Sequence, residues 1–133
     1  MCGFSGVISN SELHSGIIRN SIAAIKHRGP DDSLIFSGEK QFFACELSNS
    51  DSKESFAMLP ANLKSHTFFG FNRLSIIDLS ANGMQPFFDE KNEIIFMLNG
   101  EIYNYIELRN EFLANETFKS QTDSEVAFRL YLK

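Results

Sequence analysis

The start of the chain carries the first side chain that could do chemistry. Cys2 follows the initiator methionine and precedes Gly3. Removal of Met1 needs a small second residue, and it would leave a thiol and a free α-amino group on the same cysteine. These two kinds of group ordinarily titrate close to one another, so the amine can accept the thiol proton directly or through a water. Cys2 is therefore a candidate nucleophile that needs no distant histidine. A small buried thiol near a chain end is the alternative.

A cation and an anion farther along the chain could bind the charged ends of a small molecule. Arg73 ends an apolar stretch, and a guanidinium at a strand end suits bidentate binding of a carboxylate. An ion pair with Asp78 or another surface acid is the alternative. Asp123 lies in the first turn of a predicted helix, where its carboxylate could bind an ammonium group. Capping or interaction with the helix dipole would explain the same residue.

The pair Asn99-Gly100 is open to two interpretations. It stands between apolar stretches, where Asn-Gly is typical of a two-residue hairpin turn. The same pair could form an oxyanion hole from the Asn side-chain amide and the Gly backbone N–H. Glycine would let the backbone approach a reacting carbonyl closely. The pair by itself favours the turn.

Composition limits the kinds of protein that fit. The chain has 133 residues, of which 43% are hydrophobic, and this suits one globular domain with its own core. The net charge of -5 argues against a nucleic-acid or anionic-membrane binder. We find no apolar stretch long enough for a membrane span and no signal peptide. The 2 cysteines make neither a disulfide framework nor a zinc site, so a reduced, cytoplasmic protein without a metal is expected.

The elements that must position these side chains follow from local patterns. Apolar stretches predict strands at residues 3–9, 34–36, 42–47, 67–74 and 93–98. Residues 49–65 read as a surface loop, and residues 80–85 as a turn. Residues 15–26 predict a helix, with Ile18, Ile22 and Ile25 on one face. Helices do not alternate regularly with strands, so an α+β fold with antiparallel sheet is favoured over a doubly wound one.

Two capping boxes predict the starts of the last helices. Asn104 with Glu107 would begin one helix, and Thr122 with Glu125 would begin the next. The chain then ends at Lys133 without a C-cap. This abrupt end predicts a fragment or an incomplete domain.

In this order, the stretches closely resemble the N-terminal glutaminase domain of glutamine-hydrolysing asparagine synthetases. That domain is a class II glutamine amidotransferase within the N-terminal nucleophile hydrolases. The Arg73 and Asn99 blocks resemble asparagine synthetase more than the phosphoribosyl or hexosamine amidotransferases. The matching blocks, which run over nearly the whole chain, are Met1-Cys2-Gly3-Phe4-Ser5-Gly6, His27-Arg28-Gly29-Pro30-Asp31, Arg73-Leu74-Ser75-Ile76-Ile77-Asp78, Gln85-Pro86, Asn99-Gly100-Glu101-Ile102-Tyr103-Asn104 and Thr122-Asp123-Ser124-Glu125.

The resemblance implies a four-layer αββα fold and L-glutamine as the substrate. Cys2, once Met1 is gone, would attack the side-chain amide, and its α-amino group would be general base and then general acid. Asn99 and the Gly100 N–H would hold the tetrahedral oxyanion. Arg73 would bind the α-carboxylate. Residues further implied to bind substrate are Asp123 with Glu101 for the α-ammonium, and Leu74, Ser75, Ile76 and Ile77, whose backbone would line the pocket.

The resemblance covers only part of a larger protein. Residues 1–133 would be the N-terminal part of the amidotransferase domain, with an insertion or loop at about 39–66. The ammonia would go to ATP-dependent amidation of aspartate in a synthetase domain, and ATP and Mg belong there, with no cofactor expected in this domain. No nucleic-acid or membrane partner is expected, and an oligomer is compatible. The chain alone is expected not to make asparagine, and its own glutaminase activity is left open.

Two other functions fit the same residues. The fold could persist as a non-catalytic remnant or interaction module, and replacement of Cys2 by alanine would then change nothing. An amidotransferase with a different ammonia acceptor would share every site residue, because the acceptor is bound by another domain.

Overall fold

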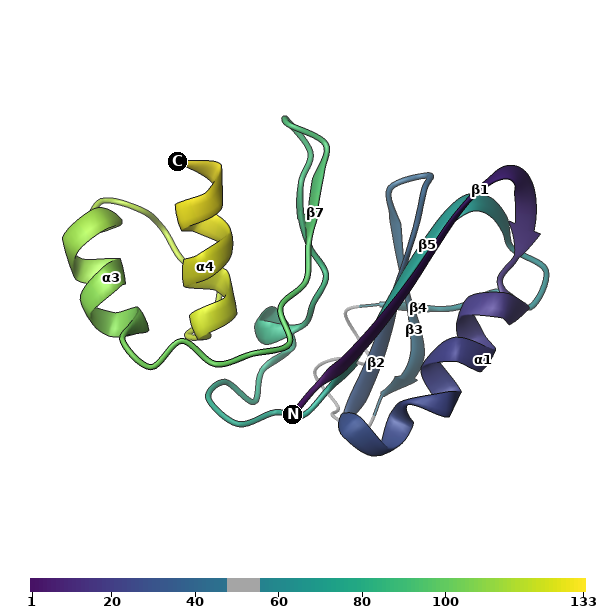
Figure 1. Cartoon of the computed structure of the whole chain (residues 1–133), viewed down its shortest axis with the longest axis horizontal. Helices are drawn as coiled ribbons and strands as arrows, with labels where there is room; N and C mark the ends of the chain where they lie inside the picture. The colour runs from purple at the N-terminus through teal and green to yellow at the C-terminus, as the bar shows by residue number, and fades with distance from the viewer. Residues whose placement is uncertain (48–55) are drawn as a thin grey trace.

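The chain folds into two β-sheets and several helices in the computed structural model, which describes residues 1–47 and 56–133 (Figure 1). The large sheet has five strands, which are in order β1 (Gly3–His14), β5 (Lys64–Arg73), β2 (Asp32–Ser37), β3 (Gln41–Leu47) and β4 (Ala57–Met58). The second sheet is a hairpin of β6 (Phe87–Asp89) and β7 (Ile94–Phe96). The helices are α1 (Gly16–Ala24), α3 (Tyr105–Phe112) and α4 (Asp123–Leu132), with 3-10 turns at Lys26–Arg28 and Ala81–Gly83. The predicted α+β class is confirmed.

Helix α1 packs on one face of the large sheet and builds the apolar core. Ile18 and Ile22, four residues apart, are buried there as their spacing predicts. Gly70 allows the close approach of the helix, because a Cβ at this position would collide with the Ile22 side chain. The sheet and the following loop contribute the rest of this core, which is Ile35, Phe43, Leu59 and Phe68.

The register of the sheet brings the chain start beside the end of β5. β1 and β5 are antiparallel with Gly3 opposite Asn72, so Cys2 lies next to Arg73. On its other edge β5 pairs with β2, and Asp32 is opposite Arg73. Alternate residues of a strand point to opposite faces, so Arg73 points away from the face that α1 covers. Three segments far apart in the sequence therefore meet at one end of the sheet.

The β6–β7 hairpin lies between the large sheet and α4. The Phe88 ring contacts Phe36 of β2, with 5.2 Å between centroids. Phe87 points the other way and stacks on Phe128 of α4 at 5.6 Å. Phe96, opposite Phe87 in the hairpin, also contacts Phe128, at 5.5 Å. The packing order is therefore α1, large sheet, hairpin, and then α4 with α3 (Figure 1).

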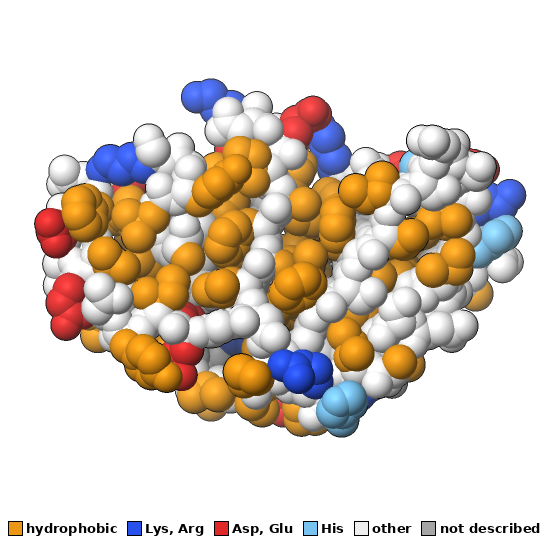
Figure 2. All heavy atoms as spheres, viewed as in Figure 1, with side chains coloured by type: hydrophobic (Ala, Val, Ile, Leu, Met, Phe, Trp, Pro, Cys, Tyr) orange, Lys and Arg blue, Asp and Glu red, His pale blue; other side chains and the backbone are white. Residues whose placement is uncertain are grey.

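An open groove is bordered by the large sheet, by β6 and by α4. A cavity of about 400 Å³ lies there, and aromatic side chains such as Phe42, Phe88 and Phe128 line it together with charged Glu125 and Arg129. Figure 2 shows apolar side chains across the middle of this view, with acidic and basic side chains mainly around the edge. Apolar and charged side chains therefore line this groove together.

The Asn99-Gly100 pair is not a hairpin turn, so that interpretation is wrong. β7 ends at Phe96, and the residues after Gly100 enter a turn rather than a strand. The hairpin turn falls just after β6, where Glu93 adopts a φ of 55°. β6 was not predicted, because Phe87 and Phe88 are both apolar and face different layers, which removes the alternating pattern of a half-buried strand.

The two predicted capping boxes have different outcomes. Thr122 Oγ1 accepts a hydrogen bond from Glu125 N at 3.2 Å, so the cap of α4 is confirmed. Asn104 makes no side-chain cap bond to α3, and that prediction is wrong. Its backbone is already turned, with φ -97° and ψ 28°, whereas a capping residue is normally extended.

The predicted loop at residues 49–65 is partly wrong. Residues 48–55 lie outside the described part of the chain. Beyond them, β4 pairs in parallel with β3, and β5 already begins at Lys64. The described part of the stretch, residues 56–65, therefore contributes to the sheet through β4 and the start of β5, because pairing with neighbouring strands outweighs its polar composition. An insertion at about 39–66 stays a prediction.

Candidate active site

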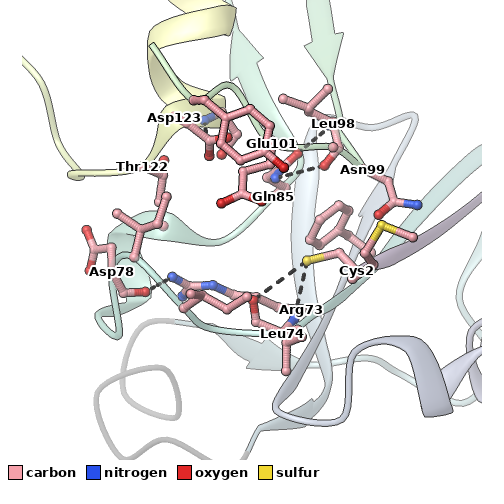
Figure 3. Close-up of a pocket in the computed structure, with 18 residues that line it drawn as sticks. Cys2, Arg73, Leu74, Asp78, Gln85, Leu98, Asn99, Glu101, Thr122 and Asp123 are labelled. Carbon is pink, nitrogen blue, oxygen red and sulfur yellow. Dashed lines mark hydrogen bonds between the residues drawn. The ribbon is translucent and has the colours of Figure 1, made fainter. Parts of the chain in front are cut away.

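A pocket of about 290 Å³ opens where the chain start, the end of β5, the segment after β7 and the start of α4 meet (Figure 3). Its walls combine charged and apolar groups. Residues that line it include Met1, Cys2, Arg73, Leu74, Ile76, Ile77, Asp78, Gly83, Gln85, Leu98, Asn99, Gly100, Glu101, Thr122 and Asp123.

The Cys2 thiol lies at the wall of this pocket against the backbone of Leu74. Leu74 N donates to Cys2 Sγ at 3.3 Å. The thiol can in turn donate to Leu74 O, which lies 3.8 Å away. The Cys2 thiol is half-buried, and neither Cys2 nor Cys45 forms a disulfide. Met1 also lines the pocket and is 73% exposed. The nucleophile is thus held by main-chain contacts, with its preceding residue at the pocket mouth.

Arg28 connects Cys2 with Asn99. Its Nε donates to Cys2 O at 3.1 Å. The Asn99 amide finds matching partners when Nδ2 donates to Cys2 O at 3.0 Å and Oδ1 accepts from Arg28 Nη2 at 3.2 Å. These bonds hold the amide of Asn99 directly beside the cysteine. Sequence reasoning assigned no role to Arg28; a basic residue directly before Gly29-Pro30 was the available signal.

The Arg73 guanidinium forms part of the pocket wall and is only 4% exposed. Nη1 donates to Ser80 O at 2.6 Å, and Nη2 donates to Asp78 O. Burial lowers the pKa of Arg73 from its ordinary value, and the charges of Asp78 and Asp32 partly oppose this. Arginine nevertheless stays a cation at neutral pH. Sequence reasoning offered an ion pair with Asp78 as the alternative role of Arg73. The guanidinium does interact with Asp78, but it donates to the main-chain carbonyl, and the Asp78 carboxylate acts on it through its charge.

Asp123 fixes the segment that follows Asn99. Its Oδ2 accepts from Ile102 N at 2.8 Å, and its Oδ1 accepts from Ser124 N at 2.8 Å. The carboxylate is 8% exposed, and its remaining lone pairs are available to an ammonium group. Glu101 and Gly100 are exposed beside it. Among the described residues, a Cβ at Gly100 would meet Leu98 at 3.5 Å, which is ordinary van der Waals contact.

Further residues shape the pocket from behind. Gln85 Oε1 accepts from Leu98 N at 2.6 Å, and Gln85 Nε2 donates to Leu98 O at 3.3 Å, which holds the residue before Asn99. A Cβ at Gly83 would collide with the Arg73 guanidinium, and a Cβ at Gly29 would collide with the backbone of β5. The sequence signal for Gln85 was its place before Pro86. Gly83 carried no signal of its own.

Nearly every predicted site residue lies at this pocket. Cys2, Arg73, Asn99, Gly100 and Asp123 come together from separate segments, with Leu74, Ile76, Ile77 and Glu101 beside them. Ser75 is not among the lining residues, and its N–H donates to Asp31 Oδ2 at 2.7 Å. The roles that sequence reasoning gave these residues remain predictions.

The described residues hold no group of three or more His, Cys, Asp or Glu side chains that could bind a metal ion. Among the same residues, no helix is long and apolar enough to cross a membrane.

Comparison with known proteins adds the family. A glutamine amidotransferase domain model matches residues 59–133. Asparagine synthetase [glutamine-hydrolyzing] 2 of Bacillus subtilis is 39% identical over 98% of this chain and 14% of its own length. Putative asparagine synthetase [glutamine-hydrolyzing] 2 of Methanocaldococcus jannaschii is 35% identical over 100% of this chain and 24% of its own length.

A relative of another kind matches as well. Glutamine--fructose-6-phosphate aminotransferase [isomerizing] of Lactococcus lactis is 29% identical over 100% of this chain and 22% of its own length. The chain thus spans less than a quarter of the length of these curated relatives. Since the family model matches more than half of the chain and the relatives align along nearly all of it, this chain belongs to the glutamine amidotransferase domain family.

Proposed function

We propose that this chain carries the glutamine-hydrolysing half-reaction of an asparagine synthetase, with Cys2 as its nucleophile. The observation that carries the proposal is the meeting of Cys2, Arg73, Asn99 and Asp123 in one pocket. A free amino acid has one charge of each sign, and the pocket offers Arg73 to its carboxylate and Asp123 to its ammonium group. The family match supports glutamine as the substrate.

The reaction begins with Cys2. After removal of Met1, the α-amino group takes the thiol proton, and the thiolate attacks the side-chain amide carbon of glutamine. The tetrahedral adduct collapses as the same amine protonates the leaving nitrogen, which yields ammonia and a thioester. Water then attacks the thioester, releasing glutamate and the thiol. If Met1 is retained, the nitrogen of Cys2 is an amide and cannot serve as the base.

Asn99 and Gly100 stabilise the adduct. The Asn99 amide is held beside Cys2 by Arg28 and by Cys2 O, so the amide group is in place before substrate arrives. The exposed Gly100 N–H offers a second donor at the point where a carbonyl oxygen becomes negative. A glycine at this position is consistent with the role, because contacts among the described residues would also accommodate a Cβ there.

The substrate is held at its charged end. Arg73 binds the α-carboxylate, and Asp123 with exposed Glu101 binds the α-ammonium. Backbone from the 74–77 loop lines the side of the pocket, with Leu74, Ile76 and Ile77 as its wall. The packing order of α1, large sheet, hairpin and α4 supports a four-layer αββα arrangement of the N-terminal nucleophile hydrolase type.

The fate of the ammonia lies outside this chain. We assign it to ATP-dependent amidation of aspartate by a synthetase domain, in the cytoplasm, because several relatives are asparagine synthetases. ATP and Mg would be bound by that domain. A different acceptor is the second candidate, since the Lactococcus relative is named for a fructose-6-phosphate aminotransferase.

The test uses a glutamine analogue that carries an electrophilic carbon in place of the side-chain amide. Intact mass first establishes that Met1 has been removed. We expect one adduct, mapped to Cys2, and glutamate release from glutamine. The Cys2→Ala variant should lose both, while Cys45→Ser should keep both, because Cys45 packs against the α1 core rather than lining the pocket. Labelling of Cys45 alone, or equal glutamate release from Cys2→Ala, would contradict the proposal and favour a non-catalytic module.

A further inference from the structure

The Asp78 side chain joins the two parts of the pocket that carry opposite charges. Its Oδ1 accepts from Ser80 N at 2.8 Å, within the loop that follows β5. Its Oδ2 accepts from Gln121 N at 2.9 Å, two residues before Asp123. One carboxylate therefore bridges the Arg73 loop and the start of α4, which are separated by more than forty residues in the sequence.

The same loop determines where the Arg73 guanidinium lies. Nη1 and Nη2 donate to the carbonyl oxygens of Ser80 and Asp78, at the two ends of the short turn that the Asp78 carboxylate closes. Gly83 leaves no further room on one side, because a Cβ there would collide with the guanidinium. Figure 3 shows Asp78 at the tip of Arg73, with Thr122 above it and Asp123 beyond.

Charge favours this bridge at neutral pH. Partial burial acts to raise the pKa of Asp78, but hydrogen bonds from Ser80 and Gln121 and the charge of Arg73 outweigh it and lower the pKa. The carboxylate is then ionised and accepts from both N–H groups at once. An asparagine at this position has only one side-chain oxygen to accept with. Its NH₂ group would face one of the two backbone N–H donors, with which it cannot form a hydrogen bond.

We propose that Asp78 is a positioning residue, which sets the spacing between Arg73 and Asp123 and thereby the affinity of the pocket for the α-amino acid head group. This inference rests on the proposed function. Asp78 acts through its neighbours: it holds the loop that directs Arg73 and the segment that leads into Asp123. The reactive end of the pocket is held by contacts that do not involve the Asp78 side chain: Arg28 donates to Cys2 O, and Leu74 N, directly after β5, donates to Cys2 Sγ. Loss of Asp78 should therefore weaken binding of the head group and leave the thiol reactive.

The experiment compares two reagents on the chain without Met1. One is the electrophilic glutamine analogue, which has the α-amino acid head group, and the other is iodoacetamide, which lacks it. Rates of modification of Cys2 are followed by peptide mass mapping over a range of analogue concentrations. For Asp78→Asn we expect the analogue concentration at half-maximal rate to rise about 10- to 100-fold, with the maximal rate changed less than about threefold. The iodoacetamide rate should stay within about twofold of the unsubstituted chain, since no head group is bound.

Matched variants separate positioning from folding. Asp89→Asn is the control. Asp89 Oδ1 accepts a similar turn hydrogen bond from Lys91 N, at 3.3 Å, but Asp89 does not line this pocket. It should change neither reagent's rate. Asp78→Glu keeps the charge and should recover part of the lost affinity; it also serves if Asp78→Asn does not fold. Thermal unfolding of each variant is measured alongside.

The outcomes are distinct. Equal slowing with both reagents would overturn the inference, since Asp78 would then support the whole site rather than the head group. Unchanged half-saturation in both Asp78 variants would overturn it too, while leaving the proposed function intact. If Cys2 of the unsubstituted chain reacts with iodoacetamide but not with the analogue, the proposed function fails and this inference fails with it.

Discussion

The two halves of this molecule differ in the interactions that hold their helices in place. The half formed by α1 and the large sheet is built on buried apolar side chains, among them Ile18, Ile22 and Phe68. The half that includes α4 also has apolar contacts, such as those of Phe128, but the start of its helix buries Thr122, Asp123 and Glu125, which are satisfied by hydrogen bonds. A cavity of about 400 Å³ lies between sheet and hairpin. The candidate active site lies where the halves meet.

The difference indicates what each half contributes. Apolar burial is strong but not directional, so it stabilises the sheet that carries Cys2 and Arg73. Hydrogen bonds to buried carboxylates are directional and costly to break, so they set where Asp123 and the 99–102 segment lie. Substitutions in the first half should therefore change global stability most. Substitutions in the second half should disturb the geometry of the candidate active site even where they change the free energy of unfolding only modestly.

The largest effect is expected for Phe68→Ala. Phe68 is fully buried in the apolar core, and its removal should cost about 3 to 5 kcal/mol of unfolding free energy. Denaturant unfolding measures this. Phe112→Ala is the matched control, because Phe112 is 46% exposed and should cost far less. Similar losses for the two variants would show that the core is not the main source of stability.

Glu125→Gln should have the next largest effect. Glu125 is 3% exposed and accepts from Lys119 N, from Ser120 and from Arg129. An amide would turn one N–H₂ toward these donors, at a cost of about 2 to 3 kcal/mol at pH 7. Unfolding by denaturant checks the value, with Glu116→Gln as the control, because Glu116 lies 3.8 Å from Arg129 and is largely exposed.

The same variant has a pH signature. Burial acts to raise the pKa of Glu125, but hydrogen bonds from residues 119 and 120 and from Arg129 outweigh it, so the folded pKa lies below the ordinary 4.5. Its stabilising contribution is therefore complete above that value and is lost as the pH falls through the folded pKa. Glu125→Gln should show a shallower loss of stability below about pH 4.5 than the unsubstituted chain. Parallel acid profiles would contradict this assignment.

Gln85→Leu should act mainly on the site. The change leaves Leu98 N and Leu98 O without their side-chain partner and should cost about 1 to 2 kcal/mol of stability. Because Leu98 precedes Asn99, the maximal rate of Cys2 modification by the glutamine analogue should fall about tenfold. Gln41→Leu, on the exposed part of β3, is the control. An unchanged maximal rate would mean that Asn99 is held by Arg28 alone.

The smallest effect on stability is expected for Gly100→Ala. The new Cβ would only contact Leu98 at 3.5 Å, so the unfolding free energy should change by less than about 0.5 kcal/mol. Under the proposed function, glutamate release should nevertheless fall, because the methyl group would crowd the place assigned to the substrate carbonyl. Gly83→Ala offers the contrast: its Cβ would collide with Arg73, so both stability and analogue binding should fall. Full activity of Gly100→Ala would remove Gly100 from the oxyanion site.

Much of the fold was predictable where one local signal dominated. The buried face of α1 followed from its isoleucine spacing, and the cap of α4 followed from Thr122 with Glu125. The hairpin was misplaced because Asn99-Gly100 has a turn composition, while the actual turn contains Glu93 at positive φ and no glycine. Asn104 failed as a cap because its backbone conformation is set by the preceding turn.

The candidate site was predictable as a set of residues but not as an arrangement. Taken singly, Arg73, Asn99-Gly100 and Asp123 favoured structural explanations. The order of the blocks that contain them, and the resemblance of those blocks to one family, pointed to a single site with Cys2 before any fold was known. The residues that hold these side chains in place could not be predicted from the sequence. Arg28 acts on Cys2 from 26 positions away, and Asp78 reaches Gln121 across 43 positions. Contacts at such separations leave no periodic pattern in the sequence.

The sequence by itself determined the chemistry on offer: a thiol beside a potential amine, a guanidinium at a strand end, and a carboxylate at a helix start. Only the tertiary structure decided which of these groups meet. The antiparallel pairing of β1 with β5 places Cys2 beside Arg73, and the Asp78 and Asp123 carboxylates place the start of α4 against them. The physical reason is that side-chain chemistry belongs to a single residue, whereas distance between residues depends on strand register and directional hydrogen bonds, which form only when the whole chain packs.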